Sequence, residues 1–321
     1  MRIVILCYTD GRHQDGMRIA YCLQHKYNHN ILTLSLTCDP KSIVEAIKGF
    51  KPDFCLVTIG REFSAEALKE IKKYTFLVHW SLDEHTPAED IMWEKFKNIY
   101  DLAFVKSKGL IPLLKDYCKK VIWTPMFYDT YFDGIIEVKP EKQYQLIFTG
   151  NPHITQSTLR QLYLKQLSED GYPVLVVGHY WEDKDKAFGN TYPGGLIGKE
   201  LIGFIAASKI GLNFENDLMA KIELGFSDRV IKTMSAGTLC LTHEIPGIEQ
   251  LFIPEKHLVT YKNYVDLLEK ITYYISHDDE REQIAKAGQE LVLREYNIDK
   301  VVGIYLEEIR KCLENTKRHI A

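Results

Sequence analysis

The chain has 321 residues, 45% of them hydrophobic and 26% charged, and its net charge is −4. This composition is typical of a folded globular protein and excludes a disordered or fibrous chain. The net charge gives no general attraction to nucleic acid or to an anionic membrane, although a local basic groove is compatible with it.

The first part of the chain alternates apolar runs with helical segments. Residues 2–8, 31–36, 54–59, 76–80, 102–105 and 121–123 are predicted strands, and 17–25, 40–49, 65–72, 88–98 and 110–118 are predicted helices. Continuous apolar strands separated by helices predict a parallel, doubly wound sheet covered on both faces. The periodicity lapses between residues 127 and 143, which we interpret as an interdomain linker.

The pattern restarts after this linker. Strands are predicted at 146–149, 174–177, 210–214, 239–242 and 258–260, and helices at 199–208 and 298–313. The length suits two domains of about 150 residues each. We therefore predict an α/β protein with an N-terminal domain over 1–137, a second domain over 138–297 and a final helical segment over 298–321.

The termini and the cysteines indicate an ordinary intracellular protein. Residues 1–8 form an apolar run too short for a signal peptide, and no run approaches the roughly 18 apolar residues of a membrane-spanning helix. The seven cysteines are scattered and lie mostly inside apolar runs, which favours buried thiols over a metal site or a disulfide framework. We expect a cytoplasmic protein without an integral membrane segment.

The most informative stretch begins at Ser227. It combines a hydroxyl N-cap, Arg229 and Lys232 in the first turns of a helix, and Gly237 as a stop before an apolar strand. Residues three apart share one face of a helix, and the amino end of a helix attracts anions. The segment therefore predicts a diphosphate site.

This segment, followed by Pro-Gly-Ile-Glu-Gln-Leu-Phe at 246–252 and by two amphipathic helices through 278–288, resembles the C-terminal domain of GT-B glycosyltransferases of the group 1 branch. It is most similar to the spore-maturation, CgeB-like proteins, where R-x-F-E-x-M-A-x-G, G-x-x-E-L-F and R-x-x-I-A-x-x-G occur in this order. The run from Gly198 to Asn213 also resembles that family.

The resemblance implies two Rossmann-like domains facing a central cleft, with residues 298–321 packing back toward the first domain. It implies a hexosyltransferase-like enzyme that transfers a sugar from a nucleotide-activated donor to a hydroxyl acceptor, with retention at the anomeric carbon. The nucleotide sugar is then a substrate, and no separate cofactor is expected.

Ligands of such sheets bind beyond the carboxyl ends of the strands, which gives the candidate donor residues. Gly150 and Asn151 resemble the turn on the phosphate side, with Arg160 as a counter-charge, although Gly150 is equally compatible with an ordinary turn. Gly178 resembles the turn beneath the base, where Tyr180 or the adjacent tryptophan either stacks on a ligand or packs internally. Asn213 is the candidate for sugar or nucleotide contacts.

Lys232 stands where the family usually carries a glutamate that accepts hydrogen bonds from the ribose. Lysine only donates, so it cannot replace that carboxylate. Either Lys232 faces phosphate, or Asp228 or Glu223 takes over the ribose, or the donor is not a common nucleoside diphosphate sugar. A solvated surface lysine is the fourth interpretation.

The catalytic candidates lie in the first domain. His13 follows the first strand, and Asp83 follows the fourth, in a segment that resembles the family's W-x-x-D-D-P at Trp80 and Asp83. A carboxylate or imidazole at a strand end can position an acceptor hydroxyl or remove its proton, but Asp83 is also compatible with helix capping. No D-x-D or zinc-ligand spacing occurs, so we predict a metal-independent enzyme.

Two other functions fit the pattern less well: a GT-B-shaped sugar-nucleotide epimerase, and a non-catalytic two-domain protein that binds a nucleotide or sugar. The acceptor classes compatible with a transferase are a glycan, a lipid-linked saccharide, a protein or a modified nucleobase. The sequence does not define the oligomeric state.

Overall fold

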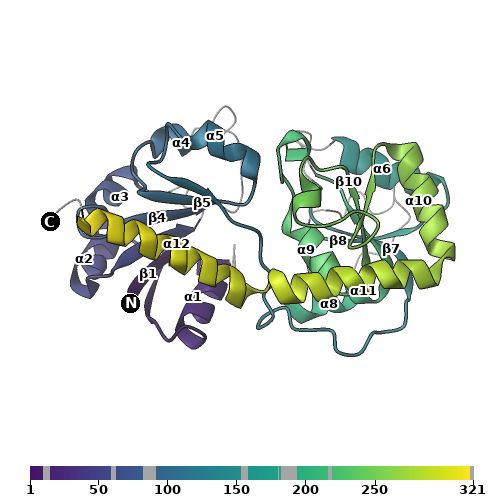
Figure 1. Ribbon diagram of the computed structural model, residues 1–321, viewed down its shortest axis with the longest axis horizontal. Helices are drawn as coiled ribbons and strands as arrows, with labels where there is room; N and C mark the ends of the chain where they lie inside the picture. The colour runs from purple at the N-terminus through teal and green to yellow at the C-terminus, as the bar shows by residue number, and fades with distance from the viewer. Residues whose placement is uncertain are drawn as a thin grey trace. The chain divides into compact units, whose positions relative to one another are not determined.

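The computed structural model describes residues 1–9, 15–58, 63–81, 92–152, 158–179, 181, 194–215 and 219–318. The chain divides into two compact units, each built around one parallel sheet (Figure 1). Unit 1 contains Met1–Pro125 together with the chain from Ile298 onward, and unit 2 contains Met126–Asn297. The predicted pair of α/β sheets is therefore confirmed.

Unit 1 has a six-stranded parallel sheet in the order β2-β1-β3-β4-β5-β6. The strands are β1 (Arg2–Cys7), β2 (Asn30–Ser35), β3 (Phe54–Thr58), β4 (Phe76–Ser81), β5 (Leu102–Val105) and β6 (Val121–Trp123). Ile3 of β1 lies opposite Ile31 of β2 on one side and Phe54 of β3 on the other. Residues 3–7 of β1 are fully buried, as expected for a central strand covered on both faces.

The helices of unit 1 are α1 (Asp15–His25), α2 (Pro40–Phe50), α3 (Ala65–Ile71), α4 (Met92–Lys95), η1 (Lys108–Leu110), α5 (Ile111–Leu114) and α12 (Ile298–Arg318). Asp39 caps α2 by accepting a hydrogen bond from the Ser42 amide at 2.9 Å, and Pro40 occupies the first turn. α12, yellow in Figure 1, packs against α1. Its Tyr305 ring lies 4.8 Å from that of Phe104, so α12 is part of this unit's core.

Two helices of unit 1 differ from the sequence expectation. Of the helix expected at 88–98, residues 88–91 lie outside the described residues and α4 covers only Met92–Lys95. The helix expected at 110–118 is present as η1 and α5 and ends at Leu114. The Tyr117 carbonyl accepts a hydrogen bond from the Asn98 amide at 2.8 Å. This carbonyl therefore bonds to a residue outside the expected helix.

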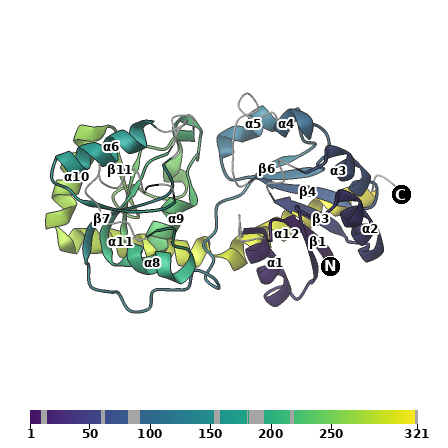
Figure 2. The same cartoon turned by 180° about the vertical axis from the view of Figure 1, so that it is seen from behind.

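Unit 2 has a five-stranded parallel sheet in the order β11-β10-β9-β7-β8. The strands are β7 (Tyr144–Thr149), β8 (Val174–Val177), β9 (Ser208–Asn213), β10 (Leu239–His243) and β11 (Val259–Tyr261). The helices are α6 (Thr158–Glu169), α8 (Gly198–Ala206), η2 (Met219–Lys221), α9 (Asp228–Ser235), η3 (Ile248–Gln250), α10 (Tyr264–Ser276) and α11 (Asp278–Glu295). α6 and α10 lie on one face of the sheet, and α8 and α9 lie on the other, with α11 along α9 (Figure 2).

The boundary between the units lies at Pro125–Met126, earlier than the boundary after residue 137 that the sequence indicated. Residues 127–133, the first part of the segment that we interpreted as linker, are held in unit 2. The Tyr128 amide donates to the Tyr296 carbonyl at 2.7 Å, and the Tyr128 hydroxyl donates to the Gly134 carbonyl at 2.8 Å. Because these bonds are local to unit 2, the turn after Pro125 folds with the second unit.

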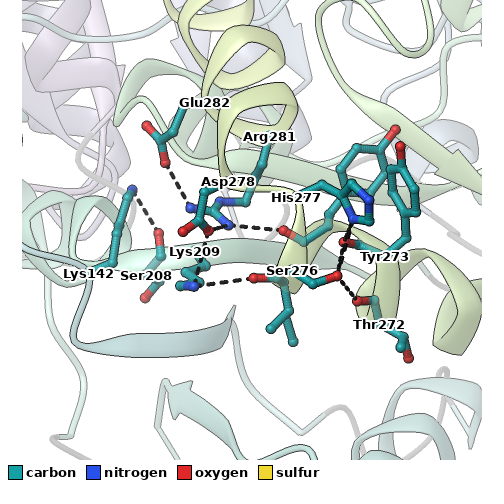
Figure 3. Close-up of polar contacts among 12 residues, drawn as sticks. Lys142, Ser208, Lys209, Thr272, Tyr273, Ser276, His277, Asp278, Arg281 and Glu282 are labelled. Carbon is teal, nitrogen blue, oxygen red and sulfur yellow. Dashed lines mark hydrogen bonds and ion pairs between the residues drawn. The ribbon is translucent and has the colours of Figure 1, made fainter.

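A polar network fixes the junction of α10 and α11 to the amino end of β9 (Figure 3). Lys209 donates to Oδ1 of Asp278 at 3.1 Å, and the buried Arg281 donates to the same carboxylate. Lys142, just before β7, donates to the Ser208 carbonyl at 2.9 Å, and burial lowers the pKa of Lys142 to about 8. The network lies at the edge opposite the strands' carboxyl ends, so it supports the fold rather than a ligand site there.

All seven cysteines are free thiols, and five of them are buried, which confirms the sequence interpretation. Burial raises the pKa of Cys7 to about 11 and of Cys240 to about 12, and only thiolates react quickly. We expect a thiol-titrating disulfide reagent to modify the exposed Cys38 first and the partly exposed Cys312 next, and the other five only in denaturant. Cys38→Ser should remove the fast phase, and rapid native-state reaction of a third thiol would contradict the expectation.

Candidate functional site

The strand order of unit 2 reverses at β7, because β8 lies on one side of it and β9 on the other. In doubly wound sheets this reversal opens a crevice at the carboxyl ends of the two strands that flank it, and ligands bind there. The residues at this point are those after Thr149 of β7, those after Asn213 of β9, and the start of α9.

Arg229, in the first turn of α9, joins the ends of β7 and β9. Its side chain is buried, and its Nε donates to the carbonyl of Thr149. Its Nη1 donates to Oδ1 of Asn213 at 2.5 Å. The guanidinium also lies 4.7 Å from the centroid of the Phe148 ring, so packing and hydrogen bonds fix its position.

Arg160 approaches the same ring from α6. It is 4% exposed and donates to two main-chain oxygens, from Nη1 to Asn151 at 2.8 Å and from Nη2 to Phe214 at 3.0 Å. Its guanidinium lies 5.3 Å from the Phe148 ring. Burial, reinforced by the charge of Arg229, lowers the pKa of Arg160 to about 9, so Arg160 remains charged at neutral pH.

The charges at this point do not balance. The carboxylate beside the two guanidinium groups is Glu215, whose Oε1 lies 4.0 Å from Nη1 of Arg229 and accepts the Ser227 amide at 2.7 Å. Among the residues that the structure describes, two buried cations face one carboxylate here, and an anion stabilises a positive site of low dielectric strongly. Nη2 of Arg229 makes no hydrogen bond to the residues that the structure describes, so it can donate to such an anion.

Gly150 and Gly178 are required by close backbone packing. Gly150 has φ +142°, and its carbonyl accepts a hydrogen bond from the indole of Trp181 at 2.7 Å. A Cβ at Gly178 would lie 2.2 Å from the Gly150 carbonyl oxygen, and one at Gly150 would lie 2.9 Å from Nη2 of Arg229. The two turns are therefore interlocked. A phosphate contact at Gly150 stays a prediction, and the glycine leaves room beside Arg229 for one.

The other residues of these turns have mainly positioning contacts. Asn151 accepts the His179 amide through Oδ1 at 2.7 Å and so links the turn after β7 to the turn after β8. Trp181 is 1% exposed and meets Phe148 edge-on, so it packs internally rather than offering a stacking surface. Tyr180, the other stacking candidate, lies outside the described residues.

Asn213 is fully buried at the end of β9, and both ends of its amide are used. Oδ1 accepts from Arg229 and from the Ser227 hydroxyl, and Nδ2 donates to Thr242 Oγ1 at 2.8 Å. It therefore orients Arg229. A direct contact between Asn213 and the nucleotide or sugar stays a prediction.

Lys232 and Arg229 do not act as one cationic face. Arg229 turns inward, whereas Nζ of Lys232 lies 2.6 Å from Oδ2 of Asp228, one helical turn away. Lysine and aspartate at this spacing attract each other directly, which the shared-face interpretation left out. Ser227 occupies the N-cap position of α9, but its hydroxyl makes no capping bond because it bonds to Asn213 and Arg229.

Both catalytic candidates, His13 and Asp83, lie outside the described residues. Phe148 and Thr149 are the site residues that sequence reasoning missed. Phe148 is buried near the end of β7, and both guanidinium groups lie over its ring. An aromatic residue at the end of a strand, followed by a glycine turn, is the signal that could have indicated this contact.

Within the described ranges, no three His, Cys, Asp or Glu side chains are grouped so that they could hold a metal ion.

Comparisons with known proteins relate the chain to a family model and to a fold. A family model described as "Glycosyl transferase-like" matches residues 157–307. No curated protein matches the sequence. Across the part of the chain that the structure describes, no helix has the length and apolar character needed to span a membrane.

Several solved structures share the fold over their whole length. A glycosyltransferase from Rickettsia africae is 13% identical with a TM-score of 0.73, covering 98% of this chain and 99% of that one. Sucrose-phosphate synthase from Thermosynechococcus elongatus is 11% identical with a TM-score of 0.71, covering 98% and 100%. HepE from Anabaena, in complex with UDP and glucose, is 10% identical with a TM-score of 0.71, covering 97% and 100%. The chain thus has the GT-B fold of glycosyltransferases, as predicted.

Proposed function

We propose that the protein is a glycosyltransferase that moves a hexosyl group from a nucleotide-activated donor to a hydroxyl acceptor. The observation that carries this proposal is the pair Arg160 and Arg229, two buried cations that lie beside Glu215 at the β7–β9 crevice. The HepE complex with UDP and glucose supports a UDP-sugar as the donor. The motifs between residues 227 and 288 support the CgeB-like branch.

The donor diphosphate binds above Gly150. Nη2 of Arg229 donates to it, and the amino end of α9 adds to the positive field. The same charges stabilise the negative charge that grows on the departing nucleotide. Arg160 contributes through its charge, because its Nη1 and Nη2 already donate to main-chain oxygens.

Asp228 accepts the hydrogen bonds of the ribose hydroxyls in place of the family's glutamate, whose position is occupied by Lys232. The Asp228 side chain is 46% exposed and is held by Lys232, which places a carboxylate within one helical turn of the family position. A carboxylate accepts hydrogen bonds from the ribose hydroxyls, which lysine cannot do. Glu223 is the alternative acceptor, and its Oε1 already accepts the Gln250 amide at 2.8 Å.

Transfer proceeds with retention and without a metal. The acceptor oxygen bonds to the anomeric carbon as the bond from that carbon to the phosphate oxygen breaks, and the departing phosphate takes the acceptor proton. Asp83 and His13 position the acceptor hydroxyl and contribute through orientation. The arginine pair supplies the positive charge that a divalent cation supplies in other enzymes.

The test is an assay with UDP-glucose, UDP-galactose and UDP-N-acetylglucosamine in EDTA, against glycan, lipid-linked, protein and modified-DNA acceptors. We expect acceptor-dependent release of UDP and a product with the donor's anomeric configuration. Activity lost in EDTA and restored by manganese would contradict metal independence, and an inverted product would contradict retention. An epimerised donor without transfer would replace the proposal by the epimerase.

A further inference from the structure

The amide of Asn213 connects Arg229 to a hydroxyl group on the neighbouring strand. Asn213, the last residue of β9, is paired in register with Thr242 of β10, and both residues are fully buried. Oδ1 of Asn213 accepts a hydrogen bond from Nη1 of Arg229 at 2.5 Å, and Nδ2 donates to Oγ1 of Thr242 at 2.8 Å. The amide therefore fixes the guanidinium at the start of α9 to the edge of the sheet.

The partners of this amide determine its orientation. A guanidinium only donates hydrogen bonds, so the amide oxygen of Asn213 must face Arg229. The Ser227 hydroxyl, 3.3 Å from Oδ1, donates on the same side. The amide nitrogen then faces Thr242, whose hydroxyl oxygen has lone pairs that accept from it. A flipped amide would place two donors against each other, so only one orientation satisfies these groups.

An aspartate at position 213 would make the same hydrogen bonds with a different charge. One of its oxygens would accept from Arg229, and the other would accept from the Thr242 hydroxyl, which can turn to donate. A carboxylate in contact with a guanidinium forms an ion pair, which would largely cancel the positive charge of Arg229. The hydrogen bonds alone therefore do not require an asparagine here, whereas an anionic ligand does.

The other acceptors that hold Arg229 are also uncharged. Its Nε donates to the Thr149 carbonyl. Its Nη1 also donates to the Ser227 hydroxyl at 3.1 Å and to the Phe214 carbonyl at 3.3 Å. The carboxylate oxygen Oε1 of Glu215 lies 4.0 Å from Nη1, too far for a hydrogen bond. Neutral acceptors fix the position of the guanidinium and leave its charge available to a ligand.

We propose that Asn213 is a specificity-determining residue, whose uncharged amide fixes Arg229 and keeps the site selective for an anion. Thr242 is a positioning residue, because it holds the amide nitrogen. Asn213 acts through Arg229 and needs no contact with the ligand. This role rests on the proposed function, since the donor diphosphate is taken as the anion, but it concerns ligand charge and not the transfer step.

The test is calorimetry on the full chain with UDP and with inorganic pyrophosphate, together with urea unfolding. Asn213→Asp should lower both affinities at least about tenfold, because a new unit charge in a buried site opposes the anion. Its urea midpoint should stay closer to that of the wild type than the midpoint of Asn213→Ala, because only alanine removes the bond to Arg229. A merely structural role would lower affinity and stability together.

Thr242 is tested with two substitutions of similar size. Thr242→Val removes the acceptor of the Asn213 amide nitrogen, so it should lower the urea midpoint and weaken UDP binding. Thr242→Ser keeps the hydroxyl and should retain both. Equal behaviour of the valine and serine variants would contradict the positioning role of Thr242.

Asn263→Asp is the matched control for the charge. The exposed Asn263 caps α10 by accepting the Asp266 amide at 3.1 Å, and an aspartate keeps this cap while water screens the added charge. Both affinities should stay unchanged. Wild-type affinities in a folded Asn213→Asp protein would overturn the role of Asn213 and leave the proposed function standing.

The expected loss of pyrophosphate binding in a protein that transfers no sugar would support the role of Asn213 and contradict only the proposed function. A wild-type protein that binds neither UDP nor pyrophosphate would contradict both.

Discussion

Replacing Arg229 with alanine is expected to lower the free energy of unfolding of unit 2 by about 3 kcal/mol and to remove measurable UDP binding. The loss in stability follows because the Thr149 carbonyl, the Asn213 amide oxygen and Glu215 all lose a partner inside the protein. The loss of binding follows because Arg160 alone would balance Glu215. Urea unfolding and calorimetry with UDP measure the two effects.

Arg294→Ala is the control for this substitution. Arg294 is also a helical arginine, but it is exposed and pairs with its neighbour Glu295, so its removal should change stability by less than about 0.5 kcal/mol. Arg229→Lys keeps the charge and loses the forked hydrogen bonds, so it should retain part of the UDP affinity. An Arg229→Ala protein with wild-type stability and UDP affinity would show that the anion site lies elsewhere.

Gly178→Ala should destabilise unit 2 by about 3 kcal/mol and weaken UDP binding although residue 178 needs no contact with the ligand. The added Cβ would lie 2.2 Å from the Gly150 carbonyl oxygen and 2.6 Å from its carbon. Both atoms are backbone, so the turn after β7 must move, and overpacking of this kind costs about 1–3 kcal/mol or more. The movement also disturbs Gly150 beneath Arg229.

Gly203→Ala provides the comparison. Gly203 lies inside α8, where a Cβ would meet nothing within 4 Å. Alanine there should raise the stability by up to about 1 kcal/mol and leave UDP affinity unaltered. Thermal unfolding and calorimetry on the two variants separate the steric effect at Gly178 from a general effect of glycine replacement; equal stability of the two proteins would argue against interlocked turns.

The strands and their parallel arrangement could be predicted because they are short apolar runs, and central strands such as β3 and β5 are buried along their whole length. The place of Arg229 at the start of a helix could also be predicted, because the cap residue before it and Gly237 after it form a local pattern. The contacts of Arg160 could not, since its bond to the Phe214 carbonyl joins residues 54 positions apart. The pairing of Lys232 with Asp228, an acid one turn earlier in the helix, is a local contact that the sequence analysis did not consider, and the role of Lys232 at the donor stays a prediction.

Unit 2 interrupts unit 1, because the chain leaves the first unit after Pro125 and returns to it only at Ile298. The entry and exit of the insertion are tied together by the bond between Tyr128 and Tyr296. During synthesis the second unit can therefore complete its core first. The core of the first unit is completed only when α12 has been synthesised and covers Phe54, Leu56 and Phe104. Until that helix arrives, the nascent chain carries an uncovered apolar face, which is the kind of surface that chaperones bind.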